Sequence, residues 1–387
     1  MDAFDRLKLL SEMMALEPAE EQTAARRPIP GNAASHKVES LCIHPAVMPN
    51  GQRLPMLKTL LTSACERNCY YCPFRAGRDF RRATFKPDEM AQTTMALHRA
   101  GIAHGLFLSS GVAAGGVHTQ DLLIDAAEIL RRKYQFRGYI HLKLMPGAEY
   151  DQVLRAMQLS DRVSINLEAP GPERLTRLAP SKSFYDELFQ PLRWVEQIRR
   201  SQPARLGWKG RWPSSTTQFV VGAAGESDLE LLSTTSRLHR QAGLGRAYFS
   251  IFTPIPDTPL ENLPAANPAR ELRLYQASFL LRDYGFDLED LPFEASGDLP
   301  LDNDPKLIWA RQNLAHQPVE INRAGQETLL RIPGIGPAGV QAILRARRRS
   351  PLRSLADLRK IGVNPDRAQP FILLDGHRPP RQLSLNL

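Results

Sequence analysis

Residues 65–72 read CERNCYYC, which places three of the chain's four cysteines within eight positions. Neighbours this close cannot close a useful disulfide loop, and an odd number of thiols leaves one without a partner. The chain begins MDAFDRLK, without the basic segment and apolar run of a secretory signal peptide, so we expect a reducing, cytoplasmic location. Clustered thiols in such a compartment indicate a metal centre or catalysis.

The spacing of the trio is Cys-x3-Cys-x2-Cys, which supplies three ligands. Structural zinc sites and ordinary iron–sulfur clusters take four protein ligands. Three thiolates on a cubane cluster leave one iron open to a substrate or cofactor. The remaining cysteine, Cys42, lies upstream. It either closes a zinc site with the trio or is a buried thiol, since free cysteine is among the most buried residue types.

CERNCYYC resembles the Cys-x3-Cys-x-aromatic-Cys signature of the radical S-adenosylmethionine (SAM) superfamily, with Tyr71 at the aromatic position. The resemblance implies that Cys65, Cys69 and Cys72 hold a [4Fe-4S] cluster whose open iron chelates S-adenosyl-L-methionine. It further implies that an electron donor reduces the cluster, that the cofactor is cleaved to a 5′-deoxyadenosyl radical, and that this radical abstracts hydrogen from a substrate. The protein's own part is then to bind, orient and exclude water.

The chain of 387 residues has room for two domains and carries a net charge of +9. It has no apolar run approaching the ~18 residues of a membrane span, so no membrane partner is expected. Leu7, Leu10, Met13 and Met14 at helical spacing predict an N-terminal amphipathic helix. We expect this helix and a linker over residues 1–38, a catalytic barrel over 39–290, a Pro- and Asp-rich linker over 291–317 and a basic tail domain over 318–387.

Six short apolar or β-branched runs alternate with longer amphipathic segments in the catalytic region. They are LKTLLTS (57–63), GLFLSS (105–110), GYIHLKLM (138–145), RVSINLE (162–168), TTQFVVG (216–222) and AYFSIFT (247–253). Strands separated by helices predict right-handed βαβ units and a parallel sheet. The predicted fold class is therefore α/β, and it matches the partial (β/α)6 TIM-like barrel of the radical SAM family. Sites in parallel barrels gather at the carboxyl ends of strands, where the cysteine run follows the first strand.

Strand alternation places Ser164, Asn166 and Glu168 on one face of the fourth run. A polar triplet in a buried strand needs partners or a ligand. Two interpretations stay open: a satisfied internal polar network, or the site for the ribose of SAM that the resemblance implies for Asn166 and Glu168.

The turn after the second run contains Ser109, Ser110 and Gly111. By position, and not by residue identity, it replaces the glycine-rich turn that receives the methionyl amino group in the family. A glycine at a strand end also lets backbone approach a ligand closely. With Tyr71, these residues complete the predicted cofactor-binding set.

Residues 321–363 predict two short helices around the tight turn PGIG. The segment is similar to the helix–hairpin–helix of DNA-repair and bacterial competence proteins, in which hairpin amides and a helix N-terminus hold a DNA phosphate. The residues that the resemblance assigns to DNA are Gly334, Ile335, Gly336 and Gly339, and the arginines that follow add Arg345, Arg347, Arg348 and Arg349. From Pro318 onward, twelve Lys/Arg stand against five Asp/Glu.

Two further stretches mix cations with aromatic residues: RAGRDFRRATFK (75–86) and LGWKGRW (206–212). Each either lines a path for an unpaired nucleic-acid strand or is a solvated loop with buried ring anchors. Together with the tail, the chain resembles a bacterial group of radical SAM proteins linked to DNA modification or repair. The alternatives are an RNA-modifying radical SAM enzyme and a non-catalytic, zinc-stabilised DNA-binding adaptor.

Overall fold

The structure, a computed structural model, describes residues 2–14, 43–47 and 53–380. The chain divides into two compact units, the first made of Met1–Glu226 with Arg237–Asn267 and the second of Ser227–Ser236 with Pro268–Leu387. None of the helices in the described part of the chain combines the length and apolar character of a membrane span.

A seven-stranded sheet forms the centre of the first unit, with the strands in chain order from β1 to β7. β1 pairs antiparallel with β2, and every later pairing is parallel. The strands are β1 (Ile43–Val47), β2 (Arg53–Leu60), β3 (Gly105–Ser109), β4 (Tyr139–Lys143), β5 (Arg162–Ser164), β6 (Ser214–Val221) and β7 (Arg246–Ile251). The six predicted strands correspond to β2–β7, which confirms the α/β partial barrel, whereas β1 was not predicted.

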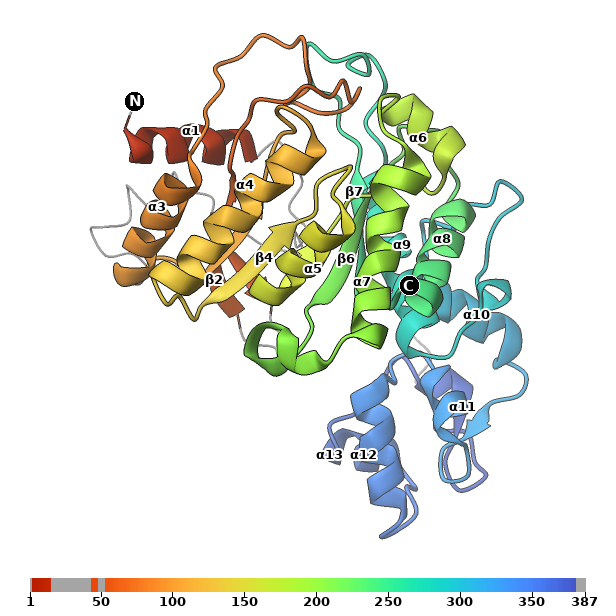
Figure 1. The fold of residues 1–387 in the computed structure, drawn as a ribbon. Helices are drawn as coiled ribbons and strands as arrows, with labels where there is room; N and C mark the ends of the chain where they lie inside the picture. The colour runs from red at the N-terminus through yellow and green to blue at the C-terminus, as the bar shows by residue number, and fades with distance from the viewer. Residues whose placement is uncertain (1, 15–42, 48–52, 381–387) are drawn as a thin grey trace. The chain divides into compact units, whose positions relative to one another are not determined.

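Helices cover the sheet, and Figure 1 shows α3, α4, α5 and α7 along one of its faces. The helices between β2 and β7 in the chain are α3 (Pro87–Arg99), α4 (Gly116–Glu128), α5 (Tyr150–Leu159), α6 (Pro172–Leu178), α7 (Gln190–Ser201) and α8 (Asp228–Ala242), with π-helical turns at Ile129–Lys133 and Phe184–Phe189 and 3₁₀ turns at Ala204–Leu206 and Trp208–Gly210. β3 and β4 are buried at every position, as expected for parallel strands with both faces covered.

The predicted N-terminal helix is present as α1 (Ala3–Met14) and packs on β2 and α3. Leu7 and Leu10 are fully buried, which confirms the amphipathic pattern. Arg6 anchors the helix: its guanidinium lies 2.9 Å from Glu89 and 4.6 Å from the ring centroid of Phe85. The predicted linker after this helix and Cys42 lie outside the described residues.

The second unit contains α9 (Pro268–Asp283), α10 (Pro305–Asn313), α11 (Gln326–Leu330), α12 (Pro337–Arg347) and α13 (Leu355–Lys360), with 3₁₀ turns at Leu288–Asp290 and Gln369–Phe371. A short parallel pair joins β8 (Val319–Glu320) to β9 (Ile372–Leu373). The core of this unit includes Ala310 of α10 and Leu314, the residue that follows α10. Residues 291–317 are therefore not a linker, and the predicted boundary at 318 divides a continuous core.

The stretch LGWKGRW (206–212) packs at the edge of the sheet where β5 and β6 begin. The Trp208 ring stacks 3.8 Å from the Arg131 guanidinium carbon, and Lys209 lies 3.5 Å from Asp161, the residue before β5. The cysteine run follows the opposite, carboxyl end of β2. These contacts favour the interpretation of 206–212 as a loop with ring anchors, and the rings of Trp208 and Trp212 are half-buried.

Replacing Arg131 with Leu should destabilise the first unit by about 3–5 kcal/mol, because losing one partner of a buried ion pair leaves the other charge uncompensated. The side chains of Arg131 and Asp161 are 2% and 3% exposed, with 3.1 Å between nitrogen and oxygen. Arg132→Leu is the matched control: its side chain is 71% exposed and 3.8 Å from Glu128, so it should cost less than about 1 kcal/mol. Urea unfolding of the full chain measures both, and equal losses would contradict the structural role of Arg131.

A buried lysine supports the turn between α11 and α12 in the second unit. The Lys306 ammonium donates to the carbonyl of Ile335 at 2.7 Å and lies 4.5 Å from the ring centroid of Tyr284. Burial lowers the pKa of Lys306 to about 7.

The depressed pKa of Lys306 predicts a pH dependence of stability. Between about pH 7 and the ordinary lysine pKa of 10.5, the unfolded chain binds a proton here that the folded chain has lost. The folded state is therefore penalised below pH 7 and gains stability as pH rises through this window. Thermal unfolding should show that Lys306→Met flattens this rise, whereas Lys360→Met, at a side chain that is 78% exposed, should not. Parallel pH profiles for all three proteins would refute the assignment.

Candidate active site

The three clustered cysteines lie on the cysteine loop (residues 61–86), which leaves the carboxyl end of β2 and leads to α3. None of the three forms a disulfide; Cys69 is buried, and Cys65 and Cys72 are half-buried. Backbone bonds join the loop to the turn after β3, with Gly111 donating to Thr62 at 2.7 Å and Glu66 donating to Val112 at 2.8 Å. The loop therefore lies at the edge of the sheet where parallel barrels place their sites.

The turn after β3 is shaped by this close approach. A Cβ on Gly111 would lie 2.2 Å from the carbonyl oxygen of Ala64 in the cysteine loop, so only glycine fits. Ser109 is buried as the last residue of β3. The Ser110 Oγ is also buried and has no hydrogen-bond partner among the described residues. Of the predicted turn residues, Gly111 has a packing role and Ser110 offers an unsatisfied polar atom.

Arg82 fixes the far end of the cysteine loop. Its guanidinium donates to the carbonyls of Ser63 at 2.7 Å, Phe74 at 3.0 Å and Arg75 at 2.9 Å, and it lies 4.2 Å from the ring centroid of Phe80. Within the basic stretch 75–86, Arg82 thus holds the backbone of the cysteine loop. This favours the interpretation of the stretch as a loop with buried ring anchors.

Glu168 occupies a buried position beyond the end of β5, with φ of +66°. Its Oε1 accepts a hydrogen bond from Lys182 at 2.9 Å, and the Tyr71 hydroxyl also bonds to this carboxylate. Burial raises the pKa of Glu168, but the Lys182 charge and the bond from Tyr71 outweigh burial and hold it below its usual value. Oε2 has no hydrogen-bond partner in the described part of the chain. An ionised, buried carboxylate therefore keeps one oxygen available to a ligand.

The other two residues of the predicted triplet are satisfied within the barrel. Ser164 Oγ lies 2.8 Å from His141 Nε2, and Asn166 accepts a hydrogen bond from Lys143. Burial holds the pKa of His141 well below its usual value, so the ring is neutral at pH 7. These contacts favour the internal-network interpretation at Ser164 and Asn166, whereas Glu168 combines partners with an unsatisfied oxygen.

Lys182 is the residue that the sequence did not single out. Its side chain is 8% exposed, and it bonds to both Glu168 and Cys69. Burial lowers the pKa of Lys182, but Cys69 and Glu168 outweigh burial and raise it above the usual range, so the ammonium is charged. The segment SKS (181–183) has no motif that distinguishes this lysine, because its burial depends on contacts distant in sequence.

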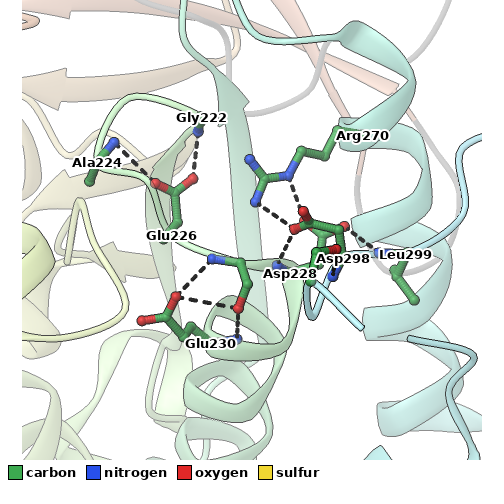
Figure 2. A network of polar contacts seen from close by, with 10 residues as sticks. Gly222, Ala224, Glu226, Asp228, Glu230, Arg270, Asp298 and Leu299 are labelled. Carbon is green, nitrogen blue, oxygen red and sulfur yellow. Dashed lines mark hydrogen bonds and ion pairs between the residues drawn. The ribbon is translucent and has the colours of Figure 1, made fainter. Parts of the chain in front are cut away.

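Figure 2 shows the turn after β6, where Glu226 accepts hydrogen bonds from the amides of Gly222 at 2.5 Å and Ala224 at 3.1 Å. Glu226, the last residue of the segment VVGAAGE (220–226), thus stabilises the turn in which it lies. In the second unit, the same figure shows Asp228 accepting from Arg270 at 2.6 Å and from the Leu299 amide at 2.9 Å. Both carboxylates have structural partners.

Three cysteines without a disulfide lie on one loop, and unsatisfied oxygens of Ser110 and Glu168 lie on the turn and segment that adjoin it. This donor set fits a cluster with one open iron and a polar ligand on it. Within the described residues, no three His, Cys, Asp or Glu side chains gather around a single point as one metal ion requires.

Residues 59–201 match the Radical SAM superfamily profile, and this range contains the whole cysteine loop, Glu168 and Lys182. No curated protein matches the chain. Among solved structures it is similar to the FeFe-hydrogenase maturase HydG from Carboxydothermus hydrogenoformans, with 16% identity, 58% of this chain and 51% of that chain covered, and a TM-score of 0.46. For methylornithine synthase PylB, the identity is 14%, the coverage 72% and 76%, and the TM-score 0.46.

The coproporphyrinogen III oxidase HemN from Escherichia coli, a radical SAM enzyme, is similar at 13% identity, with 64% of this chain and 55% of that chain covered and a TM-score of 0.38. The chain spans about half the length of the HydG chain, 51%. The profile match covers the end of β2, the cysteine loop and the strands β3, β4 and β5. The chain therefore carries a radical SAM domain, the catalytic domain of enzymes that cleave S-adenosylmethionine with a [4Fe-4S] cluster.

Proposed function

We propose that this protein is a radical SAM enzyme that modifies or repairs DNA, with the substrate held by its C-terminal helices. The observation that carries the proposal is the presence, in one chain, of a radical SAM domain and of two helices, α11 and α12, that flank a glycine turn within residues 318–387, where twelve Lys/Arg stand against five Asp/Glu. Cys65, Cys69 and Cys72 hold the cluster in this proposal. An external donor supplies the electron.

When bound, the cluster and S-adenosylmethionine supply an organic radical that removes hydrogen from the substrate. The chain's residues bind and orient the cofactor and exclude water from it. Ser110 Oγ and Glu168 Oε2 are both buried and unsatisfied. The hydroxyl can donate a hydrogen bond to the polar groups of the cofactor or accept one from them, and the carboxylate oxygen can accept one. The Lys182 ammonium beside Cys69 and Glu168 offsets the negative charge of the thiolates and the carboxylate.

The hairpin (residues 331–336) has the geometry that phosphate binding needs. Gly334 has φ of +82°, a conformation that side chains rarely adopt, and Gly336 begins α12 as its N-cap. A Cβ on Gly336 would lie 3.1 Å from the Tyr284 hydroxyl, so the turn is also packed from inside. The first amides of α12 lack acceptors within the helix and suit an anion. Ile335 is buried and anchors the turn.

The four arginines after the hairpin divide into two roles. Arg347 donates to the carbonyls of Ile321 at 3.0 Å and Ala324 at 2.6 Å, and so ties α12 to the loop before α11. Arg345, Arg348 and Arg349 are exposed. The proposal therefore keeps these three as phosphate contacts and gives Arg347 a structural role.

The cluster assignment predicts a brown protein after anaerobic reconstitution with iron and sulfide. Cys65→Ala, Cys69→Ala or Cys72→Ala should each lose most of the bound iron and the visible absorbance, because the cluster depends on three thiolates. Cys42→Ala should keep both. Iron analysis and absorbance measure the result. A colourless zinc protein, or loss of metal on Cys42→Ala alone, would favour the zinc-stabilised adaptor.

Glu168→Gln should weaken binding of S-adenosylmethionine about tenfold or more without lowering the iron content, because a hydrogen bond to a charged group contributes about 1.5–3 kcal/mol. Glu66→Gln is the matched control, an exposed acid on the cysteine loop. Equilibrium binding and release of 5′-deoxyadenosine with dithionite measure the effect. Equal affinity in the two variants would remove Glu168 from the cofactor site.

Replacing Arg345, Arg348 and Arg349 together by Gln should weaken duplex DNA binding and reduce its salt dependence. Each lost phosphate contact lowers the slope of log affinity against log salt by about 0.9. Arg132→Gln controls for loss of exposed charge elsewhere. Fluorescence anisotropy measures the slopes. Unchanged binding by the triple variant would contradict the tail's role, and preference for RNA of the same sequence would favour the RNA-modifying alternative.

A further inference from the structure

A buried lysine bonds to one of the three clustered cysteines. The side chain of Lys182 is 8% exposed, and its ammonium donates to Glu168 at 2.9 Å. The same ammonium bonds to the thiol of Cys69, which is itself buried, whereas Cys65 and Cys72 are half-buried. Lys182 therefore contacts the least exposed sulfur of the three, where water screens a neighbouring charge least.

Two hydrogen bonds from the cysteine loop hold the segment that carries this lysine. The Arg67 guanidinium donates to the carbonyl of Ser181 at 2.6 Å, and the Tyr70 amide donates to the carbonyl of Leu178 at 2.7 Å. Arg67 and Tyr70 stand on either side of Cys69 in CERNCYYC. The loop that supplies the sulfur therefore also fixes the backbone next to the lysine, and the contact between the two side chains is built into the fold.

The charge in direct contact with Cys69 is positive. Burial lowers the pKa of Lys182, but the negative charges of Cys69 and Glu168 outweigh burial and raise it, so the ammonium stays charged. The Glu168 carboxylate reaches the cysteine loop through the hydroxyl of Tyr71, whereas the ammonium bonds to the sulfur itself. Glu168 thus offsets the lysine within the protein without replacing it at the sulfur.

We infer that Lys182 is a positioning residue that acts through Cys69 to raise the reduction potential of the iron–sulfur cluster. Reduction takes one electron from an external low-potential one-electron donor, which is oxidised by one electron, and no bond forms or breaks. The added negative charge lies on the cluster and its thiolates, so a fixed ammonium on one sulfur stabilises the reduced state more than the oxidised state. Net charge, hydrogen bonds to the sulfurs and solvent exposure are the properties that set such potentials.

This inference rests on the cluster assignment in the proposed function and is independent of the DNA part. If it is correct, Lys182 decides which donors can reduce the cluster, because a donor transfers its electron favourably only to a centre of comparable or higher potential.

The test is an anaerobic redox titration of the full, reconstituted chain without S-adenosylmethionine, followed by electron paramagnetic resonance. Lys182→Met should lower the equilibrium constant for reduction at least tenfold, which is a shift of about 59 mV to more negative potential for one electron. Lys182→Arg keeps the charge and the donors and should stay within threefold of the wild type. Arg81→Gln is the matched control, because Arg81 is an exposed cation on the cysteine loop whose charge water and salt screen.

A second comparison covers the case in which Lys182→Met fails to fold, since that change leaves Glu168 buried without its counter-charge. Glu168→Gln alone should raise the reduction constant, because it removes a negative charge, and adding Lys182→Met to it should lower the constant at least tenfold. If these two variants both hold iron and their constants agree within threefold, the inference is overturned, even where their melting temperatures differ. A wild-type chain that holds no iron would instead refute the cluster assignment, so the two proposals fail separately.

Discussion

The buried ion pair between Glu168 and Lys182 is the constraint on which the site depends. Both side chains are nearly inaccessible to water, so each charge carries a desolvation cost that only its partners offset. Glu168 extends from the end of β5, Lys182 follows α6, and Tyr71 and Cys69 belong to the cysteine loop. One polar cluster thus ties three segments together, and a parallel backbone bridge to Phe219 of β6 fixes Glu168 in its place.

The barrel could be predicted from the sequence because its signal is local. Short apolar runs with longer amphipathic segments between them give parallel strands with helical crossovers, and all six predicted runs are strands. β1 was not predicted, because its sequence, IHPAV, is short and contains a proline, and because the strand pairs antiparallel at the edge of the sheet. Lys182 was not predicted as a site residue for a different reason. A lysine in a polar segment is expected to be solvated, and only the tertiary contacts with Glu168 and Cys69 bury this one.

The difference between local sequence pattern and tertiary contacts also explains why the domain boundary predicted at residue 318 is wrong. A passage rich in proline and aspartate reads as a linker, yet Asp304 caps α10 by accepting from the amides of Lys306 and Leu307, and α10 then adds Ala310 and Leu314 to the core around the hairpin. The buried Ile321, just past the predicted boundary, belongs to that core too. A truncation at 318 would therefore expose apolar surface, and loss of DNA binding in such a fragment would not distinguish a missing hairpin from an unfolded one.

Two glycines at the carboxyl edge show that one residue type serves opposite purposes there. At Gly111 the missing Cβ is replaced by the carbonyl of Ala64, 2.2 Å from where it would lie, so the glycine exists to let backbone pack on backbone. At Gly225 the same position faces two guanidinium groups and no backbone of another segment within 4 Å. Packing accounts for the first glycine completely. The backbone conformation accounts for the second, because L side chains rarely adopt a φ of +69° and a substitution there is strained whatever the space around it.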